Sequence, residues 1–526
     1  MGVGAELTYN SNVTALQMAN TIFGDGVSVL SASYSGPSYS AAIYSDGQLS
    51  PGVVPSNSGV ILSTGRADSF TQHNGNPNRS TGTSTDTTGT NNNAQFNAVA
   101  GAPTYDAVWL DATFVPTGNT MTIKFVFASE EYPEYINSQF NDVVGVWVNG
   151  SAVPISVGTG RTSVNNINTN TQPNLTVSNV NDTYNTEMDG FTVTLSLDMQ
   201  VTPGVANTIR IGIADVSDAQ YDSNLLIAAD SVQTAVVARD DSVTMFATGT
   251  QTINVLGNDQ SASGNALVIT QINGVPVVAG QTVVLPSGQQ IRLNADGTFT
   301  ITGDGQTENT SFTYTVSNAH GNGNGVTDTA IVNLTQIPCF VAGTLIGTPG
   351  GPRRVEGLTP GDLVLTVDDG AQPLRWIGRR TVPATGNFAP IRIAAGAFGD
   401  HGTLLVSPQH RVLLRDAMAE LLFGEDEVLV AAKDLLNHDG VCRVEGGQVE
   451  YVHLLFDRHQ VIWAEGLPTE SFLPGPQMSH SFDGAVLQEL VTLFPELDPM
   501  TGHGYGPAAR RMLRGYEAQL LLTGAA

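Results

Sequence analysis

Charged side chains are scarce in this sequence: they make up 13% of its 526 residues, and aromatic side chains make up 7%. Glycine, serine, threonine, asparagine, valine and alanine are abundant instead. This composition excludes a protein built from long, solvated helices, and it is typical of short strands joined by turns. The length exceeds what one hydrophobic core usually organises, so we expect three or four domains.

Basic residues are the scarcest charged type, and the formal net charge is -27. Residues 1–338 hold 7 basic and 26 acidic side chains, a balance of -19, whereas residues 339–526 hold 14 and 22, a balance of -8. Such an acidic front part repels phosphate, so we expect no nucleic-acid partner. The sequence contains no run of about 18 apolar residues, the length that would predict a membrane span. The first 25 residues lack a basic stretch and a continuous apolar run, so no Sec signal peptide is recognisable.

The sequence has two cysteines, Cys339 and Cys442. This number excludes a disulfide framework as the main source of stability. Pairing of the two with each other is an alternative that the sequence leaves open. Cys442 lies in a predicted hairpin, DGVCRVEGG, and we assign it no catalytic role.

Residues 1–235 are predicted to form one β-rich domain. Segments such as MTIKFVF (Met121–Phe127) and Thr208–Ile213 alternate apolar and polar residues with the period of a strand. A short amphipathic helix is predicted near Thr14–Phe23, with Ser11 or Asn12 as its N-cap.

Residues 236–335 are predicted to form a second unit, an immunoglobulin-like sandwich. Short strand patterns recur at regular spacing, including GTFTI at Gly297–Ile301, SFTYTV at Ser311–Val316 and TAIVNL at Thr329–Leu334. The pattern is similar to the cadherin-like and bacterial Ig-like modules of surface proteins.

The composition changes again over residues 336–478, which contain more arginine and leucine, both cysteines and most of the histidines. Beyond them, two helical patterns, Ala485–Phe494 and Pro507–Leu522, predict a helical tail over residues 479–526. The expected fold class is therefore mainly β, with a short helical C-terminus.

Four sequence blocks in the third unit supply the groups that peptide-bond self-attack requires. A thiol can attack the carbonyl that precedes it if a side chain handles the proton of the scissile amide and donors stabilise the oxyanion. Histidine usually handles such a proton near neutral pH. The blocks are IPCFVAGTLIGT (Ile337–Thr348), VEGLTPGDLVLT (Val355–Thr366), LLVSPQHRVLL (Leu404–Leu414) and VEYVHLLFDRHQVIWAEG (Val449–Gly466).

In this order the blocks resemble the Hint superfamily, which contains hedgehog C-terminal domains, inteins and bacterial intein-like domains. The resemblance covers roughly residues 336–475 and implies an all-β, horseshoe-like domain. It implies that Cys339 is the nucleophile at the Pro338–Cys339 bond, and that no cofactor is required. Ser407 and His410 match the Thr-x-x-His block of the family, with serine replacing threonine. The late block implies catalytic roles for Asp457 and His459.

The residues by themselves leave other interpretations open. Cys339 could be an idle surface thiol, His410 a core histidine, and Ser407 a turn residue. His453 and His459 lie six residues apart on a predicted strand, so both can face one side and one of them could be structural.

The sequence departs from inteins at the end of the domain. Inteins end on His-Asn, and this asparagine cyclises, but Thr469-Glu470-Ser471 stands here without an asparagine. The resemblance therefore implies N-terminal cleavage or transfer rather than splicing. Such a reaction occurs once per molecule, without turnover. No sterol-binding segment is present, so cholesterol transfer is not implied.

Four segments of the front part resemble the choice-of-anchor L family of surface-associated bacterial domains: SEEYPEYINSQFND (Ser129–Asp142), IADVSDAQYDS (Ile213–Ser223), GFT (Gly190–Thr192) and LSTG (Leu62–Gly65). The resemblance implies a context, extracellular or at the cell surface, rather than an activity.

Acidic residues in the same segments predict a possible Ca²⁺ site, because Ca²⁺ takes oxygen ligands from loops at strand ends. The alternative is that they are solvated loop charges. No GGxGxDxUx repeat occurs, which excludes a calcium β-roll. The candidates are Glu130, Glu131, Asp142, Asp215, Asp218 and Asp222.

Two functions are compatible with the sequence. The first is a secreted or cell-surface protein that forms a thioester at Cys339 and then releases residues 1–338 to water or transfers them to an unknown surface acceptor. The second is a non-enzymatic adhesion or structural protein whose Hint domain is degenerate.

Overall fold

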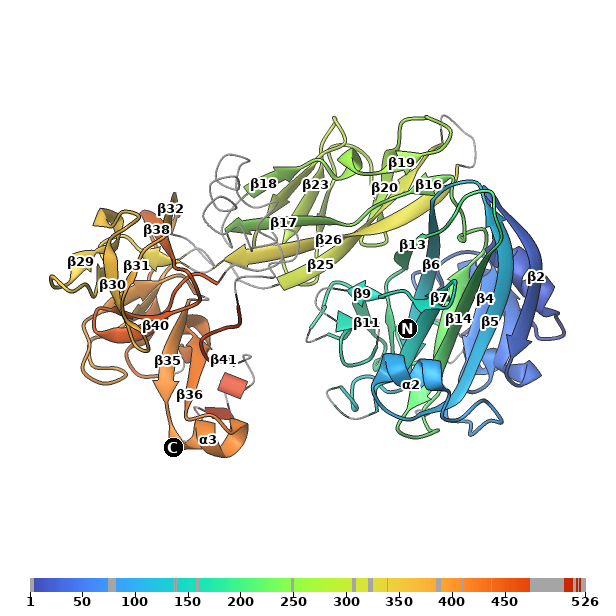
Figure 1. Cartoon of the computed structure of the whole chain (residues 1–526), viewed down its shortest axis with the longest axis horizontal. Helices are drawn as coiled ribbons and strands as arrows, with labels where there is room; N and C mark the ends of the chain where they lie inside the picture. Colours follow the sequence, from blue (N-terminus) through green and yellow to red (C-terminus); the bar gives the residue numbers. More distant parts are fainter. Residues whose placement is uncertain are drawn as a thin grey trace.

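The regular secondary structure of the computed structural model is mainly β-strand, which confirms the expected fold class (Figure 1). Three short α-helices are described: α1 (Ala15–Ile22), α2 (Ala94–Ala100) and α3 (Ala417–Phe423). The structure describes residues 4–473 and 506–521, apart from 74–81, 137, 139, 158–159, 162, 170, 247–249, 305–308, 320–324, 338, 385–388, 409, 437, 514–516 and 519.

The first group of strands is a sandwich of two antiparallel sheets. Its largest apolar core lies between them and includes Phe125 and Phe127 from one sheet and Leu110 and Ile211 from the other. One sheet contains β1 (Thr8–Asn10), β3 (Ala41–Ser45), β4 (Gly59–Ser63), β15 (Ser223–Ala228), β6 (Thr120–Ser129), β12 (Gly190–Thr192), β11 (Thr176–Ser178) and β13 (Leu195–Gln200). The other contains β2 (Val27–Ser35), β5 (Thr104–Pro116), β14 (Asn207–Val216), β7 (Val143–Val148) and β8 (Ser151–Ala152), and a separate small ribbon contains β9 (Ser156–Val157) and β10 (Gly160–Arg161).

The predicted N-terminal helix is present, but its N-cap is Thr14 rather than Ser11 or Asn12. The Thr14 hydroxyl accepts from the Gln17 backbone N–H at 3.2 Å, and the Gln17 side chain accepts from the Thr14 backbone N–H at 2.8 Å. This reciprocal capping box satisfies two donors at once, which explains why the helix begins there.

The second group of strands has its own core, built around Phe299, Phe312 and Tyr314. It contacts the first group through side-chain bonds such as Lys124 Nζ to Thr327 Oγ1 (2.6 Å) and Ser196 Oγ to Asp328 Oδ1 (2.8 Å). Its sheets contain β16 (Val236–Val237) with β19 (Gln260–Ser261); β17 (Asp241–Phe246), β26 (Thr327–Ile337), β25 (Asn309–Ser317), β20 (Val268–Ile272) and β21 (Val275–Pro276); and β18 (Thr250–Ile253), β24 (Phe299–Thr302), β23 (Gln290–Leu293) and β22 (Thr282–Val284).

The third group follows directly on β26 and buries one main core between two sheets. The first sheet contains β32 (Trp376–Pro383), β38 (Gln448–Leu455), β27 (Phe340–Val341), β34 (Leu404–Val406), β33 (Ile391–Ile393) and β37 (Val441–Arg443). The second contains β29 (Arg353–Arg354), β28 (Leu345–Ile346), β39 (Val461–Ala464), β40 (Leu467–Glu470), β35 (Arg411–Arg415), β36 (Glu427–Ala431), β41 (Arg511–Met512), β30 (Leu363–Thr366) and β31 (Gly370–Pro373).

The C-terminal segment differs from the expected helical tail. Arg511 and Met512 form β41, which pairs in parallel with β36, so the predicted Pro507–Leu522 helix is wrong in its first half. Residues 517–518 and 520–521 are helical. The predicted helix Ala485–Phe494 lies outside the described residues. No helix in the described part of the chain is long and apolar enough to cross a bilayer.

Candidate functional site

Cys339, the predicted nucleophile, lies at the start of the third group of strands. Cys339 directly precedes β27, a two-residue strand that lies between β34 and β38. Its side chain is buried, only 3% exposed, and packs with Ala384, Val449 and Tyr451. An idle surface thiol is therefore not what the structure shows. Cys339 and Cys442 are not joined by a disulfide, and Cys442 is exposed on β37. Pro338 lies outside the described residues.

Ser407 holds both backbone polar groups of Cys339. The Cys339 backbone N–H donates to Ser407 Oγ at 2.8 Å, and the Ser407 backbone N–H donates to the Cys339 carbonyl at 2.9 Å. The pairing continues that of Phe340 with Val406 in the neighbouring strands. Because the nitrogen of Cys339 belongs to the Pro338–Cys339 bond, a hydroxyl lies against the atom that would leave in that reaction.

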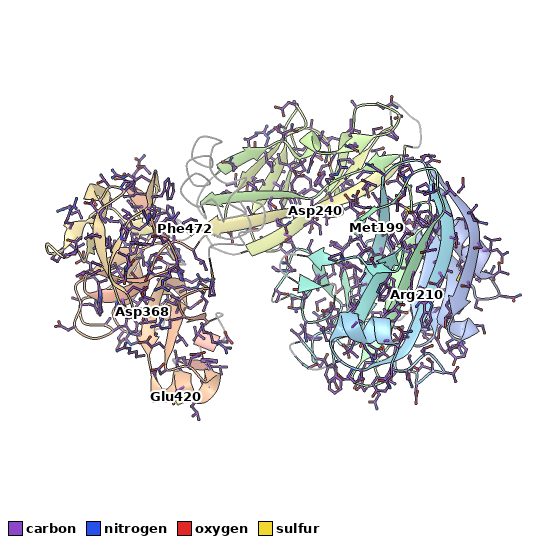
Figure 2. The ribbon with its side chains drawn as sticks, in the orientation of Figure 1. Met199, Arg210, Asp240, Asp368, Glu420 and Phe472 are labelled. Atoms are coloured by element: carbon purple, nitrogen blue, oxygen red, sulfur yellow. The ribbon has the colours of Figure 1, made fainter. Side chains whose placement is uncertain are left out.

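His453 brings a titratable side chain into contact with the thiol. Its Nε2 lies 3.2 Å from Cys339 Sγ. Strand β38 alternates: Val449 and Tyr451 pack with Cys339, while Val452 and Leu454 face the main core. His453 follows on the cysteine side by the two-residue period of a strand. The side chain of Phe472 packs against the His453 ring, with centroids 5.9 Å apart, and lies where β26 leads into the third group (Figure 2).

His410, the second residue of the Ser-x-x-His pair, is buried, with only 2% of its surface exposed. Its ring packs on Phe340, with centroids 4.2 Å apart, and its backbone N–H closes a turn by donating to the Ser407 carbonyl at 3.0 Å. Among the described residues, neither ring nitrogen has a hydrogen-bond partner. Burial, reinforced by His453, Arg411 and His459, lowers the pKa of His410 to about 3, so its imidazole is neutral at physiological pH.

His459 lies after β38 rather than on it, so it does not share a strand face with His453 as expected. Its Nε2 donates to the Ser471 carbonyl at 3.1 Å, and its Nδ1 accepts from the Ala509 backbone N–H at 2.9 Å. Burial lowers the pKa of His459 to about 4. It contributes to the electrostatic field at His410, so the two rings occupy the same buried region.

Buried Glu470 and partly exposed Arg411 form an ion pair beside His459 that sequence reasoning missed. Glu470 is 1% exposed, accepts from the Arg411 backbone N–H at 2.9 Å, and lies 3.4 Å from the Arg411 guanidinium. Its Oε2 is 3.8 Å from His459 Nε2. Burial raises the pKa of Glu470, and Arg411 opposes that rise.

Asp457 is not brought to the thiol. Both of its carboxylate oxygens accept from Arg375, at 2.8 and 2.7 Å, and its side chain is 54% exposed. The structure therefore places Asp457 in a surface ion pair, although the resemblance predicted a catalytic role.

Five of the six candidate calcium ligands of the first group, all except Asp218, are buried, which contradicts the alternative of solvated loop charges for those five. Glu131 and Asp142 repel each other, and burial raises the pKa of both. Asp142 accepts from the Ser223 hydroxyl at 2.6 Å and from the Val216 backbone N–H at 3.0 Å. Asp215, next to Asp142, also has a pKa raised well above its usual value by burial.

A second set of buried carboxylates contacts the backbone around residues 83–87. Glu130, Asp222 and Asp106 accept from the backbone N–H groups of Thr83 (2.9 Å), Thr85 (2.7 Å) and Thr87 (2.8 Å) respectively. Burial raises the pKa of Glu130 to about 8 and that of Asp222 to about 6.

The remaining candidate, Asp218, is partly exposed. Carboxylate oxygens are the donors that Ca²⁺ prefers. In the described part of the chain, however, no three His, Cys, Asp or Glu side chains are arranged to hold a metal ion. Calcium binding by Glu130, Glu131, Asp142, Asp215, Asp218 and Asp222 stays a prediction.

The structure thus defines a three-part β protein whose last part begins at a buried, histidine-contacted cysteine. Residues 338–476 match the Hint domain family, residues 7–233 match the choice-of-anchor L domain family, and residues 233–335 match a bacterial Ig domain family. These matches confirm the three resemblances, and the choice-of-anchor match indicates association with a cell surface.

Solved structures offer distant likenesses. The gp41-1 intein is 11% identical, with a TM-score of 0.17, over 25% of this chain and 97% of its own. A variant of that intein is 12% identical, with a TM-score of 0.17, over 25% of this chain and 98% of its own. A structure of the M60 catalytic domain with the CBM51-1 and CBM51-2 domains from Clostridium perfringens ZmpB is 10% identical, with a TM-score of 0.15, over 89% of this chain and 39% of its own. TM-scores this low establish no common fold for the whole chain. No curated protein matches the sequence.

Proposed function

We propose that this is a surface-associated protein whose Hint domain cleaves the chain between Pro338 and Cys339 through an N–S acyl shift. The observation that carries the proposal is the pair of contacts at Cys339. Its nitrogen and its sulfur are the two atoms that exchange the acyl group, and each contacts a side chain able to handle a proton. Ser407 Oγ lies 2.8 Å from the nitrogen, and His453 Nε2 lies 3.2 Å from the sulfur.

The first step converts an amide into a thioester. His453 takes the thiol proton, and Sγ attacks the carbonyl carbon of Pro338. The C–N bond then breaks, and the nitrogen of Cys339 leaves as an amine after receiving a proton through the Ser407 hydroxyl. The net change is transfer of the Pro338 acyl group from nitrogen to sulfur, with no proton gained or lost overall.

His410 supports this step as a neutral relay. A neutral imidazole donates from one nitrogen and accepts at the other, so His410 can pass a proton toward the leaving nitrogen without becoming a buried cation. Its unsatisfied ring nitrogens and its turn contact with Ser407 support this role.

The second step resolves the thioester. Water attacks the Pro338 carbonyl carbon, the C–S bond breaks, and the products are residues 1–338 with a C-terminal carboxylate and residues 339–526 with a free Cys339 thiol. An amine or thiol of an external acceptor would instead receive residues 1–338. His459, buried near His410, is the group we propose for this step. The absence of asparagine at Thr469-Glu470-Ser471 supports cleavage without splicing.

The second candidate is an adhesion protein with a degenerate Hint domain. The observation in its favour is the surface ion pair of Asp457, which leaves the site without the acid of the late block.

A denaturing gel and intact-mass measurement of the purified full chain distinguish the two candidates. Self-cleavage predicts two fragments that correspond to residues 1–338 and 339–526, whereas a degenerate domain leaves one intact chain.

A further inference from the structure

The last described residues of the chain, 506–513, 517–518 and 520–521, lie beyond the part that matches the Hint family, which ends at residue 476. They nevertheless pack on the Hint domain. Strand β41 extends the second sheet at β36, and the Leu513 backbone N–H donates to the Leu429 carbonyl at 2.9 Å. The segment therefore covers a strand edge that would otherwise present unpaired backbone groups.

Apolar side chains fix the segment in place. Leu513, Ala518 and Leu521 are part of the core between the two sheets of the domain. Ala509 and Met512 pack against a smaller cluster formed by Leu413, Leu429 and Val461. Burial on this scale is typical of an integral part of a domain rather than of a loose tail.

Arg510 adds charged contacts on the same side. Its Nε donates to Glu427 at 2.5 Å, and its two terminal nitrogens donate to Asp368 at 2.7 and 3.1 Å. Figure 2 shows Asp368 in the third group. Glu427 also pairs with Arg415, so this carboxylate lies between two guanidinium groups. These bonds fix the position of Arg510, which directly follows Ala509 in the chain.

The contact between Ala509 and His459 links the segment to the site. The Ala509 backbone N–H donates to His459 Nδ1 at 2.9 Å, so Nδ1 must carry a lone pair and not a proton. The ring proton is then on Nε2, which faces the Ser471 carbonyl at 3.1 Å. Both bonds are satisfied only by the neutral Nε2–H tautomer.

We infer that residues 506–513 are a positioning element of the processing site, which holds His459 in its neutral Nε2–H tautomer through the Ala509 backbone N–H. The consequence of this inference rests on the proposed self-cleavage, because the fixed proton state of His459 matters for the step that resolves the thioester. Ala509 acts through His459 and is therefore a positioning residue.

The groups around His459 determine what happens when the contact is lost. Glu470, 3.8 Å away, favours a protonated ring, whereas Arg411 and the nearby His410 do not. A protonated ring needs a hydrogen on Nδ1, where it would meet the hydrogen of the Ala509 N–H. Removing that N–H therefore raises the pKa of His459.

The direct test measures the titration of His459 in the uncleaved Cys339→Ala chain, by hydrogen–deuterium exchange at the imidazole C2 position followed by mass spectrometry. Ala509→Pro removes the N–H, and Ala509→Gly, the matched control, keeps it. We expect the proline variant to raise the His459 pKa by about one unit or more, and the glycine variant to leave it unchanged. His73, whose side chain is 80% exposed, serves as an internal reference. Equal His459 titration in both variants would overturn the inference.

The second test follows processing in the chain with Cys339 intact. Ala509→Pro should slow loss of the thioester by about tenfold or more and leave formation of the thioester unchanged. This effect is smaller than the full contribution of a proton-transferring side chain, because His459 itself is still present. If Ala509→Pro fails to fold, Arg510→Gln loosens the segment but keeps the N–H, and the same His459 shift, smaller in size, is expected. A chain that never cleaves but shows the His459 shift would refute the proposed function and uphold the inference. Cleavage without the His459 shift would uphold the proposed function and refute the inference.

Discussion

His453 Nε2 lies 3.2 Å from Cys339 Sγ at the point where the second part of the chain meets the third. A thiol next to an imidazole is activated as a nucleophile because the ring can take its proton. The Pro338 carbonyl directly precedes the nitrogen of Cys339 in the sequence, so it is the acyl group that an N–S shift to this thiol would move. The relationship therefore supports the proposed nucleophile and its proposed target.

Replacing the nucleophile should abolish cleavage. In Cys339→Ala no side chain at the junction can form the thioester, so we expect a single intact mass. Cys442→Ala, which removes the exposed thiol of β37, is the matched control and should cleave at the wild-type rate. Dithiothreitol should accelerate cleavage of the wild-type chain by intercepting the thioester. Equal fragment yields from wild type and Cys339→Ala would sink the proposal.

The two histidines near Cys339 should both act on the first step. His410→Ala removes the relay to the leaving nitrogen, and His453→Ala removes the base at the sulfur, so each should slow thioester formation by roughly 10²-fold or more. Quenched-flow samples analysed by intact mass separate this step from resolution. A His453→Ala chain that cleaves at full rate would show that its contact with the thiol is only structural, and the same result for His410→Ala would contradict the assignment of the Ser-x-x-His block.

Asp457→Asn tests the surface placement of this residue. Because Asp457 is bonded to Arg375 in solvent, its replacement should leave the cleavage rate within about twofold of wild type and cost less than about 1 kcal/mol of stability. Arg375→Gln, which breaks the same pair from the other side, should behave alike. A large loss of cleavage in Asp457→Asn alone would restore the catalytic role that the family resemblance implied.

Sequence blocks predicted the part of the site that is local in the chain. Cys339 opens its domain, and Ser407 and His410 come from one tight turn, so their types and spacing already describe their arrangement. His453 could have been identified from the alternation of Val449, Tyr451 and His453, which puts the histidine on the face that packs against the cysteine. Assigning His459 to the same strand concealed this signal.

Other features depend on contacts that no local pattern encodes. The Glu470–Arg411 pair joins residues from β40 and β35, and only the pairing of these strands brings them together. Residues Arg511 and Met512 form a strand because the edge of β36 is available, although their own sequence favours a helix. Thr14 rather than Ser11 caps α1 because Gln17 completes the capping box.

The buried carboxylates of the first group should make its stability fall as pH rises. An acid whose folded pKa is raised binds a proton in the folded state that it has lost in the unfolded state, so its contribution is lost as pH rises toward the folded value. For Glu130 and Asp222 the folded values are about 8 and about 6, and unfolded values are about 4. The melting temperature should therefore drop between pH 5 and pH 8.5, by roughly 10 °C. Glu130→Gln, which keeps the oxygen that accepts from Thr83, should flatten this dependence, whereas Asp111→Asn, in the surface pair with Arg210, should not.

Calcium provides the complementary measurement at pH 8.5, where these carboxylates are most strongly driven to ionise. If the acidic residues bind Ca²⁺ with a dissociation constant of about 10⁻⁴ M, about 1 mM ion adds about 1.4 kcal/mol and raises the melting temperature by a few degrees. Mg²⁺ at the same concentration controls for general screening, because it demands a smaller and more rigid octahedral site. A calcium-specific rise that Glu130→Gln or Asp142→Asn abolishes would support a metal site. Identical melting curves in chelator, Mg²⁺ and Ca²⁺, together with the fall in stability at high pH, would instead show that protons alone neutralise these carboxylates.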